Sequence, residues 1–172
     1  MSRRVFGRSA VVLSLVVALS GCGKKDSPTS PGGGSNCSVI VGNKGTVTAQ
    51  IDGAAFSGIT PTGGATQTPN VITLFGQTTD NTTLTLGTTS LNGTSTFGAG
   101  IVNGSSISLQ TRSCTAGTGL WMAVFGSGSG TITIQSTPTG ATGTFSGTLV
   151  AVPNSGATGT KTITGGQFNV TF

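Results

Sequence analysis

Short runs in which apolar residues alternate with small polar residues recur along most of this chain. Every second residue is apolar between Thr46 and Ile51, and the same alternation closes the chain from Phe168 to Phe172. Successive side chains of a β-strand point to opposite faces of the sheet, so a period of two predicts strands with one buried and one hydrated face. Glutamate is absent and no long window repeats apolar residues at helical spacing, so helices are not expected.

The breaks between these runs carry the residues of tight turns. Asp52-Gly53, Asn92-Gly93, Asn103-Gly104 and Gly165-Gly166 tolerate the positive φ angles that hairpin turns require. Short strands with such punctuation predict one all-β domain: a single antiparallel β-sandwich of eight or nine strands is the expected architecture, and a small closed β-barrel is the alternative. The predicted strands lie at about residues 45–51, 54–58, 71–77, 82–88, 105–111, 120–126, 130–136, 143–151 and 163–172.

The amino-terminal segment indicates where the protein resides. Three arginines precede an apolar stretch at residues 10–19, which ends in Leu19-Ser20-Gly21-Cys22. This pattern resembles the lipobox of bacterial lipoproteins, whose cysteine becomes the lipidated first residue of the mature protein. The apolar stretch is about half of the roughly 20 residues that span a bilayer as a helix. We therefore predict a lipoprotein signal peptide at residues 1–21 and lipidation of Cys22.

Other interpretations of this segment remain open. An ordinary secretory signal would leave Cys22 incidental. The stretch from Ser2 to Arg8 matches the twin-arginine export motif, whereas the strongly apolar residues 11–19 favour the general secretory route. The residue after Cys22 is Gly23 and not the aspartate associated with inner-membrane retention. We therefore expect an exported protein anchored by lipid, with the outer membrane, the cell surface or the periplasm as its location.

Residues 22–36 are predicted to form the lipidated cysteine and a flexible tether, and residues 37–172 the β domain. The tether is rich in glycine, serine and proline and contains no large apolar side chain, so it cannot offset the entropy of ordering. The formal net charge of +5 draws heavily on the signal peptide. Within the β domain, Lys44, Arg112 and Lys161 are too few and too scattered to form a nucleic-acid surface, so no nucleic-acid partner is expected.

Two cysteines follow the lipobox. Exported proteins meet oxidising compartments, and the even count favours a disulfide between Cys37 and Cys114. Two unpaired buried thiols are the alternative. Because the sequence contains no histidine, a metal site is not expected. No cofactor is expected either.

The absent residue types restrict catalysis. Without histidine, glutamate or tyrosine, the chain cannot form a Ser-His-Asp triad or a Cys-His pair. Asp52 and Asp80 are the carboxylates of the β domain, and their neighbours predict turn-forming roles for both. A non-enzymatic binding or structural module is therefore expected. The alternative is an envelope hydrolase, or an enzyme accessory, that uses Asp52 and Asp80 in a loop cleft.

The aromatic residues favour packing over recognition. Trp121 lies in the apolar run from Leu120 to Phe125, which predicts a central strand and a packing role for the indole. The few aromatics weaken a sugar-binding module, and strand propensity accounts for the threonine ladders better than ice binding does. Aromatic girdles are lacking, which disfavours an integral outer-membrane barrel.

Several segments together resemble a group of small bacterial lipoproteins of unknown function. These are the lipobox, the glycine-rich tether, the opening Thr46–Phe56, the late Gly143–Leu149 and the closing Gly165–Phe172. The resemblance implies location and architecture only. The expected partners are the membrane, through the lipid on Cys22, and an envelope protein or surface ligand for the β domain.

Overall fold

The computed structural model describes residues 40–172, except residues 99, 102 and 113–117 and the side chain of Arg112. The predicted signal peptide, the tether and all three cysteines lie outside the described residues. The described part contains no helix with the length and apolarity needed to span a bilayer. Its strands are β1 (Gly45–Ile51), β2 (Ala54–Ile59), β3 (Ala65–Gln67), β4 (Ile72–Gln77), β5 (Thr83–Thr88), β6 (Asn92–Gly98), β7 (Ser106–Arg112), β8 (Thr118–Ala123), β9 (Ser129–Thr137), β10 (Gly140–Ala151) and β11 (Thr160–Thr171).

The antiparallel sheet closes on itself. Neighbouring strands follow the order β11, β1, β2, β4, β5, β7, β8 and β10, and β10 pairs with β11 to complete the ring. Three strands lie outside the ring: β3 pairs with β4, β9 with β10, and β6 with β9. The fold is a closed eight-stranded β-barrel with three extra strands. The predicted β-sandwich is therefore wrong, and the alternative of a small closed barrel describes the ring.

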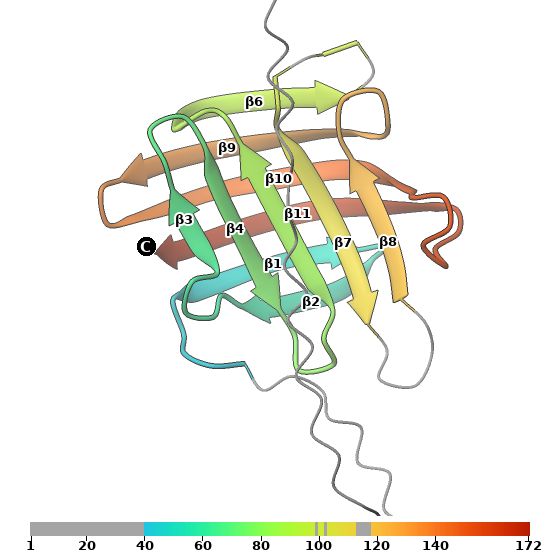
Figure 1. Ribbon diagram of the computed structural model, residues 1–172, viewed down its shortest axis with the longest axis horizontal. Helices are drawn as coiled ribbons and strands as arrows, with labels where there is room; N and C mark the ends of the chain where they lie inside the picture. The colour runs from blue at the N-terminus through green and yellow to red at the C-terminus, as the bar shows by residue number, and fades with distance from the viewer. Residues whose placement is uncertain (1–39, 99, 102, 113–117) are drawn as a thin grey trace, which may run out of the picture. The chain divides into compact units, whose positions relative to one another are not determined.

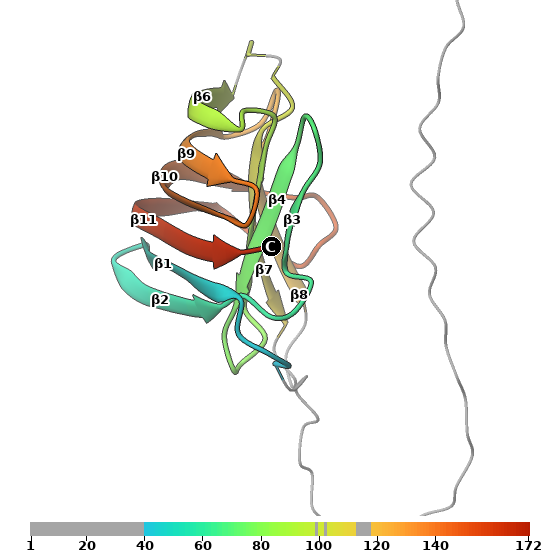
Figure 2. The same cartoon turned by 90° about the vertical axis from the view of Figure 1, so that its left-hand side faces the viewer.

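The barrel contains two layers that meet at narrow seams. In Figure 1, β3, β4, β7 and β8 run in front of and across β1, β2, β9, β10 and β11, and Figure 2 shows the two layers from the side. One residue pair, Ile59 with Gln77, joins β2 to β4, and two pairs, at Val150 and Ala151, join β8 to β10. A sandwich and such a barrel present the same alternation along each strand, so alternation alone cannot separate them.

Two glycines allow the close approach at the β2–β4 seam. A Cβ atom on Gly76 would lie 2.6 Å from the Cβ of Val47, and one on Gly58 would lie 2.7 Å from the carbonyl carbon of Gly76. A side chain at either position would force the backbone apart. Glycine within these strands therefore marks a corner of the barrel.

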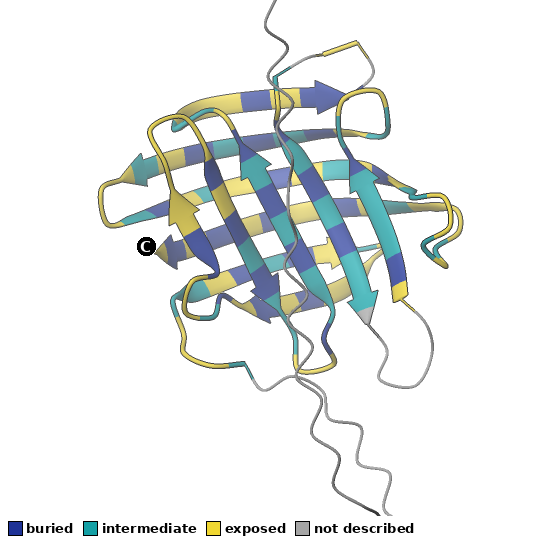
Figure 3. Cartoon of the chain, in the orientation of Figure 1, coloured by how far each residue is buried: buried dark blue, intermediate teal, exposed yellow. Residues whose placement is uncertain are grey.

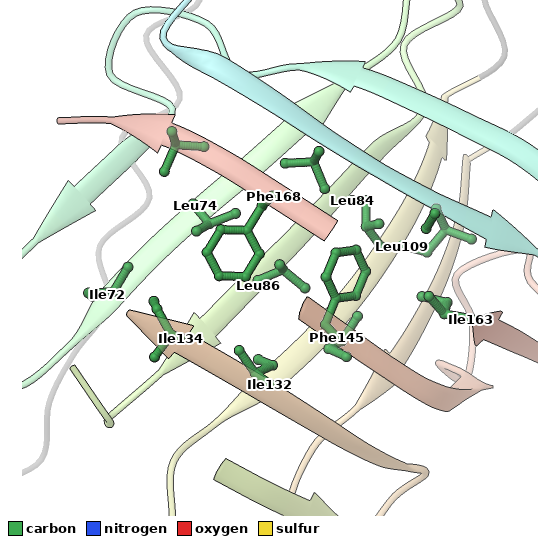
Figure 4. Packing of buried hydrophobic residues seen from close by; sticks show 14 of the residues in the cluster. Ile72, Leu74, Leu84, Leu86, Leu109, Ile132, Ile134, Phe145, Ile163 and Phe168 are labelled. Carbon is green, nitrogen blue, oxygen red and sulfur yellow. The ribbon is translucent and has the colours of Figure 1, made fainter. Parts of the chain in front are cut away.

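The hydrophobic core fills the interior of the barrel. Phe145 of β10 and Phe168 of β11 have ring centroids 6.4 Å apart, and Figure 4 shows both rings pointing toward aliphatic side chains from the other layer. Buried and exposed residues alternate along the strands, as Figure 3 shows. The interior is thus packed with side chains. The most completely buried large side chains are Phe97, Ile72, Leu74, Leu84, Leu86, Ile107, Leu109, Ile132, Ile134, Leu149, Ile163 and Val47.

All nine predicted strands overlap observed strands, whereas β3 and β6 were not predicted. Asp52-Gly53 forms the expected tight turn, with φ angles of 50° and 81°. Asn92-Gly93 is not a turn, because it begins β6. Gly165-Gly166 also lies within a strand, β11, where Gly165 has a φ of 59° and the register shifts against both neighbouring strands. This pair forms a β-bulge and not the predicted turn.

Candidate functional site

An open cleft of about 550 Å³ lies at the end of the barrel where β1, β4 and β7 finish and β11 begins. We refer to it as the barrel-end cleft. The ends of β4 and β7 lie at the lower end of the barrel in Figure 1. Barrel mouths are frequent positions for ligand sites. The cleft is lined by Ile51, Ala54, Ala55, Phe56, Ser57, Thr78, Thr79, Asp80, Thr82, Leu109, Thr111 and Lys161.

The cleft combines apolar and hydroxyl-bearing side chains. Phe56 and Leu109 are buried members of the core, with exposed fractions of 6% and 2%, so part of the cleft lining is the end of the core itself. Ser57 and Thr79 are exposed and bring hydroxyl groups to the same cleft. A guest with an apolar body would remove this apolar surface from water while its polar groups meet the hydroxyls.

Lys161 provides the cation of the cleft. Its Nζ lies 2.8 Å from Oδ2 of Asp52, in the turn between β1 and β2, and 5.4 Å from the centroid of the Trp121 ring. The Trp121 indole Nε1 donates a hydrogen bond of 3.1 Å to the carbonyl oxygen of Thr158. Lys161 is therefore held by a carboxylate and an aromatic face. Because this ion pair is partly exposed, water screens it and it adds little to stability.

Asp80 provides the carboxylate of the cleft and orders the turn between β4 and β5. Its Oδ1 accepts hydrogen bonds from the Thr78 hydroxyl and, at 3.2 Å, from the backbone N–H of Thr82. In the same turn, the amide of Gln77 donates a 2.8 Å hydrogen bond to Oδ1 of Asn81. Asp80 thus stabilises the turn through its side chain, as its neighbours in the sequence predict.

Hydrogen bonds favour the ionised form of both aspartates. The Lys161 hydrogen bond, followed by that from the Thr162 N–H, lowers the pKa of Asp52 below its ordinary value. The Thr78 hydrogen bond is the main cause that lowers the pKa of Asp80, against the opposing effect of burial. A carboxyl group that acts as a general acid needs a pKa raised toward the working pH. Neither aspartate has that property.

Only one of the two aspartates lines the cleft. Asp80 does so directly, whereas Asp52 reaches it through Lys161. The two therefore do not form a bare carboxylate pair across an open site, which weakens the hypothesis of a glycoside hydrolase. The described residues contain no group of three or more Cys, His, Asp or Glu residues that would hold a metal ion.

The lowered pKa values predict how stability depends on pH. A carboxylate whose pKa is lower in the folded state stabilises the fold above its unfolded pKa of about 3.9, and this contribution is lost as pH falls through the folded pKa. Histidine and glutamate are absent from the sequence. We expect the free energy of unfolding to be constant between about pH 5 and 8 and to fall below about pH 4.

Urea denaturation across this pH range measures the effect. Asp52→Asn removes the lowered pKa of Asp52 and should flatten the acid limb of the curve. A loss of stability centred between about pH 5 and 7 would contradict the assignment of the acid transition to these aspartates.

A second surface, on the outer side of β6, β9, β10, β11 and β1, presents rows of polar side chains. Thr94, Thr133, Thr144, Gln167 and Thr48 occupy paired positions on these five strands, in that order. The hydroxyl oxygens of Thr94 and Thr133 are 2.9 Å apart. These rows form the solvent-facing surface of the strands, which the alternation of apolar and polar residues predicts. The neighbouring aromatic rings of β10 and β11 point into the barrel, so these two strands offer no stacking platform for a sugar on this surface.

Trp121 packs as expected. It is half-buried against the core, on a strand that lies between β7 and β10. The segment after β10 lies along the same strand, where the Val152 N–H donates a 2.9 Å hydrogen bond to the Leu120 carbonyl oxygen. The predicted lipidation site Cys22 and the predicted disulfide cysteines Cys37 and Cys114 lie outside the described residues and stay predictions.

The sequence does not single out Lys161 or the cleft hydroxyls. Lys161 and Asp52 are 109 positions apart, and no local motif indicates that their side chains form an ion pair. Pairing of β11 with β1 brings them together, through register positions such as Ile163 with Ile51. Comparison with protein-family models, curated proteins and solved structures gives no match.

Proposed function

We propose that this chain is a lipid-anchored protein of the cell envelope whose β-barrel is a non-enzymatic ligand-binding module. The observation that supports binding is the barrel-end cleft, in which the apolar end of the core meets hydroxyl groups and two opposite charges. Binding is favoured over catalysis because both aspartates are ionised and occupied in turns. The hydrolase alternative lacks a carboxyl group with a raised pKa among the described aspartates, Asp52 and Asp80.

The anchor places the binding module near a membrane. Cys22 follows an export signal, and the 14 residues from 23 to 36 form the polar tether. A flexible chain of this length has a root-mean-square span of about 20 Å and an extended limit of about 50 Å. The barrel would therefore sample ligands close to the membrane surface while it remains free to reorient.

A disulfide between Cys37 and Cys114 belongs to the same proposal. It would close a loop of nearly eighty residues, which corresponds to about 4–5 kcal/mol in the chain-entropy model. Cys37 stands at the junction of tether and barrel, and Cys114 lies between β7 and β8. The bond would secure the point at which the tether joins the domain.

Cell fractionation tests the anchor. The unaltered protein should sediment with membranes and be released by detergent, whereas Cys22→Ala should appear in the soluble fraction because the lipidated atom is lost. Ser35→Ala, which changes the tether but keeps the cysteine, should behave as the unaltered protein. Detergent-sensitive sedimentation of Cys22→Ala would contradict lipid anchoring at this residue.

A further inference from the structure

We infer that the barrel-end cleft binds a small amphiphilic amine, a molecule with a protonated ammonium group attached to an apolar body. This inference rests on the proposed binding function and adds the chemical class of the ligand. The charge of the cleft, the position of its hydrogen-bond acceptors and its apolar lining each favour such a ligand.

The local charge favours a cation. Among the described side chains, the cleft lining contains one carboxylate, Asp80, and one ammonium group, Lys161. Lys161 already has a partner, since its Nζ lies 2.8 Å from Oδ2 of Asp52. The three groups together carry one net negative charge. An anionic ligand would share Lys161 with Asp52 and would be repelled by Asp80, whereas a cation is attracted by Asp80 and leaves that ion pair intact.

The hydrogen-bond acceptors for an ammonium group gather in the turn between β4 and β5. The carboxylate of Asp80 and the hydroxyls of Thr78, Thr79 and Thr82 all belong to this turn and all line the cleft. An ammonium group donates up to three hydrogen bonds and accepts none, so it matches a carboxylate surrounded by hydroxyl oxygens. The turn residues therefore recognise the charged end of the ligand.

The apolar body of the ligand meets the end of the core. Phe56 and Leu109 are buried and present carbon surface to the cleft, and Ile51 is packed against the same core. Ala54 and Ala55 are exposed on β2 and leave room above this surface. A volume of about 550 Å³ falls within the range of small-molecule sites. Each methylene that the cleft buries should strengthen binding about fourfold.

The fluorescence of Trp121 can report ligand binding in the cleft. Trp121 is the one tryptophan of the sequence, and its ring lies 5.4 Å from Nζ of Lys161, which lines the cleft. Full-length protein in phosphatidylcholine nanodiscs is titrated with n-hexylammonium, 1-hexanol and n-hexanoate at pH 7. Tryptophan fluorescence and calorimetry are recorded, with empty nanodiscs as the blank. The three probes share one alkyl chain and differ in charge.

We expect hexylammonium to bind at least tenfold more tightly than hexanol, and hexanoate to bind most weakly. Asp80→Asn should remove the preference for the ammonium over the alcohol. Asp26→Asn, which makes the same change of charge in the tether, should leave that preference intact. Ala54→Phe keeps both charges, enlarges a cleft residue on the same face of β2 as Phe56, and should weaken every probe that enters the cleft.

Other outcomes separate the inference from the proposed function. If hexanol binds as tightly as hexylammonium, or hexanoate binds best, and Ala54→Phe weakens that binding, the amine inference is overturned while the binding function stands. If Asp80→Asn folds and keeps the full preference for the ammonium, the recognition role of Asp80 is overturned. If no probe changes the fluorescence or releases heat, both the amine inference and the assignment of the cleft as the ligand site fail.

Discussion

Replacement of Phe168 by alanine is expected to lower the free energy of unfolding by about 3–5 kcal/mol. The Phe168 side chain is only 4% exposed, and its ring centroid lies 6.4 Å from that of Phe145. It also stands on β11, which pairs with both β1 and β10 and so completes the ring of strands. Alanine would leave a cavity between the two layers and would remove an aromatic pair that adds about 0.5–1.5 kcal/mol.

Phe125→Ala is the matched control, because the same atoms are removed from a side chain that is 56% exposed. Its effect should lie within about 0.5 kcal/mol. Both variants are compared with the unaltered protein by equilibrium denaturation in guanidinium chloride, read from far-UV circular dichroism. Equal losses of stability in the two variants would contradict the placement of Phe168 in the core.

The second large effect is expected at Gly143 of β10. Replacement of this glycine by alanine places a Cβ atom 2.1 Å from the carbonyl oxygen of Thr133 and 2.5 Å from a ring atom of Phe168. Since a backbone atom is the closest neighbour, a side-chain rotation cannot relieve the clash. We expect a loss of about 1–3 kcal/mol from overpacking. This sign is opposite to the gain of about 0.4–1 kcal/mol that glycine-to-alanine changes produce at unstrained positions.

Gly87→Ala on β5 is the control for this prediction. The nearest atom to its added Cβ is the Ser106 side-chain oxygen at 3.0 Å, which can move, and its φ lies outside the left-handed region. The free energy of unfolding should change by less than about 1 kcal/mol. Thermal and denaturant unfolding of the two variants should therefore separate clearly. A Gly143→Ala protein as stable as Gly87→Ala would contradict the packing of Phe168 over the backbone of β10.

Alternation of apolar and polar residues locates most strands of this protein, because nearly every strand has one face on the core. It fails for β3, which spans only three residues, and for β6, whose first residues, Asn92 and Gly93, have the chemistry of a turn. It also cannot reveal closure of the sheet. A single residue pair between β2 and β4 and two between β8 and β10 distinguish the barrel from a sandwich.

The positions of turns are predictable in part from local residue types. The neighbours of Asp52 and Asp80 predict turns at both positions, and both residues lie in turns. Asp80 accepts local hydrogen bonds from Thr78 and Thr82, whereas Asp52 is hydrogen-bonded to Lys161 and Thr162 of β11. Gly165 satisfies the same local rule but lies in a bulge, since β11 continues on both sides of it. Glycine supplies the positive φ angle in both settings, and only the strand pairing decides between them.

The barrel-end cleft is the least predictable feature, because its parts are distant in sequence. Lys161 and Asp80 each look like isolated charges along the chain, and the apolar lining from Phe56 and Leu109 belongs to two different strands. Closure of the ring brings these residues to one end of the barrel. Their combined chemistry appears only once β1, β4, β7 and β11 share that end.

The mass of the amino-terminal peptide, measured on protein purified from membranes, tests lipid anchoring most directly. We expect a mature chain that begins at Cys22, lacks residues 1–21 and carries a diacylglycerol-sized addition on that cysteine. A chain that begins at another residue, or an unmodified Cys22 in the membrane-bound protein, would contradict the lipid-anchored barrel proposed for this molecule.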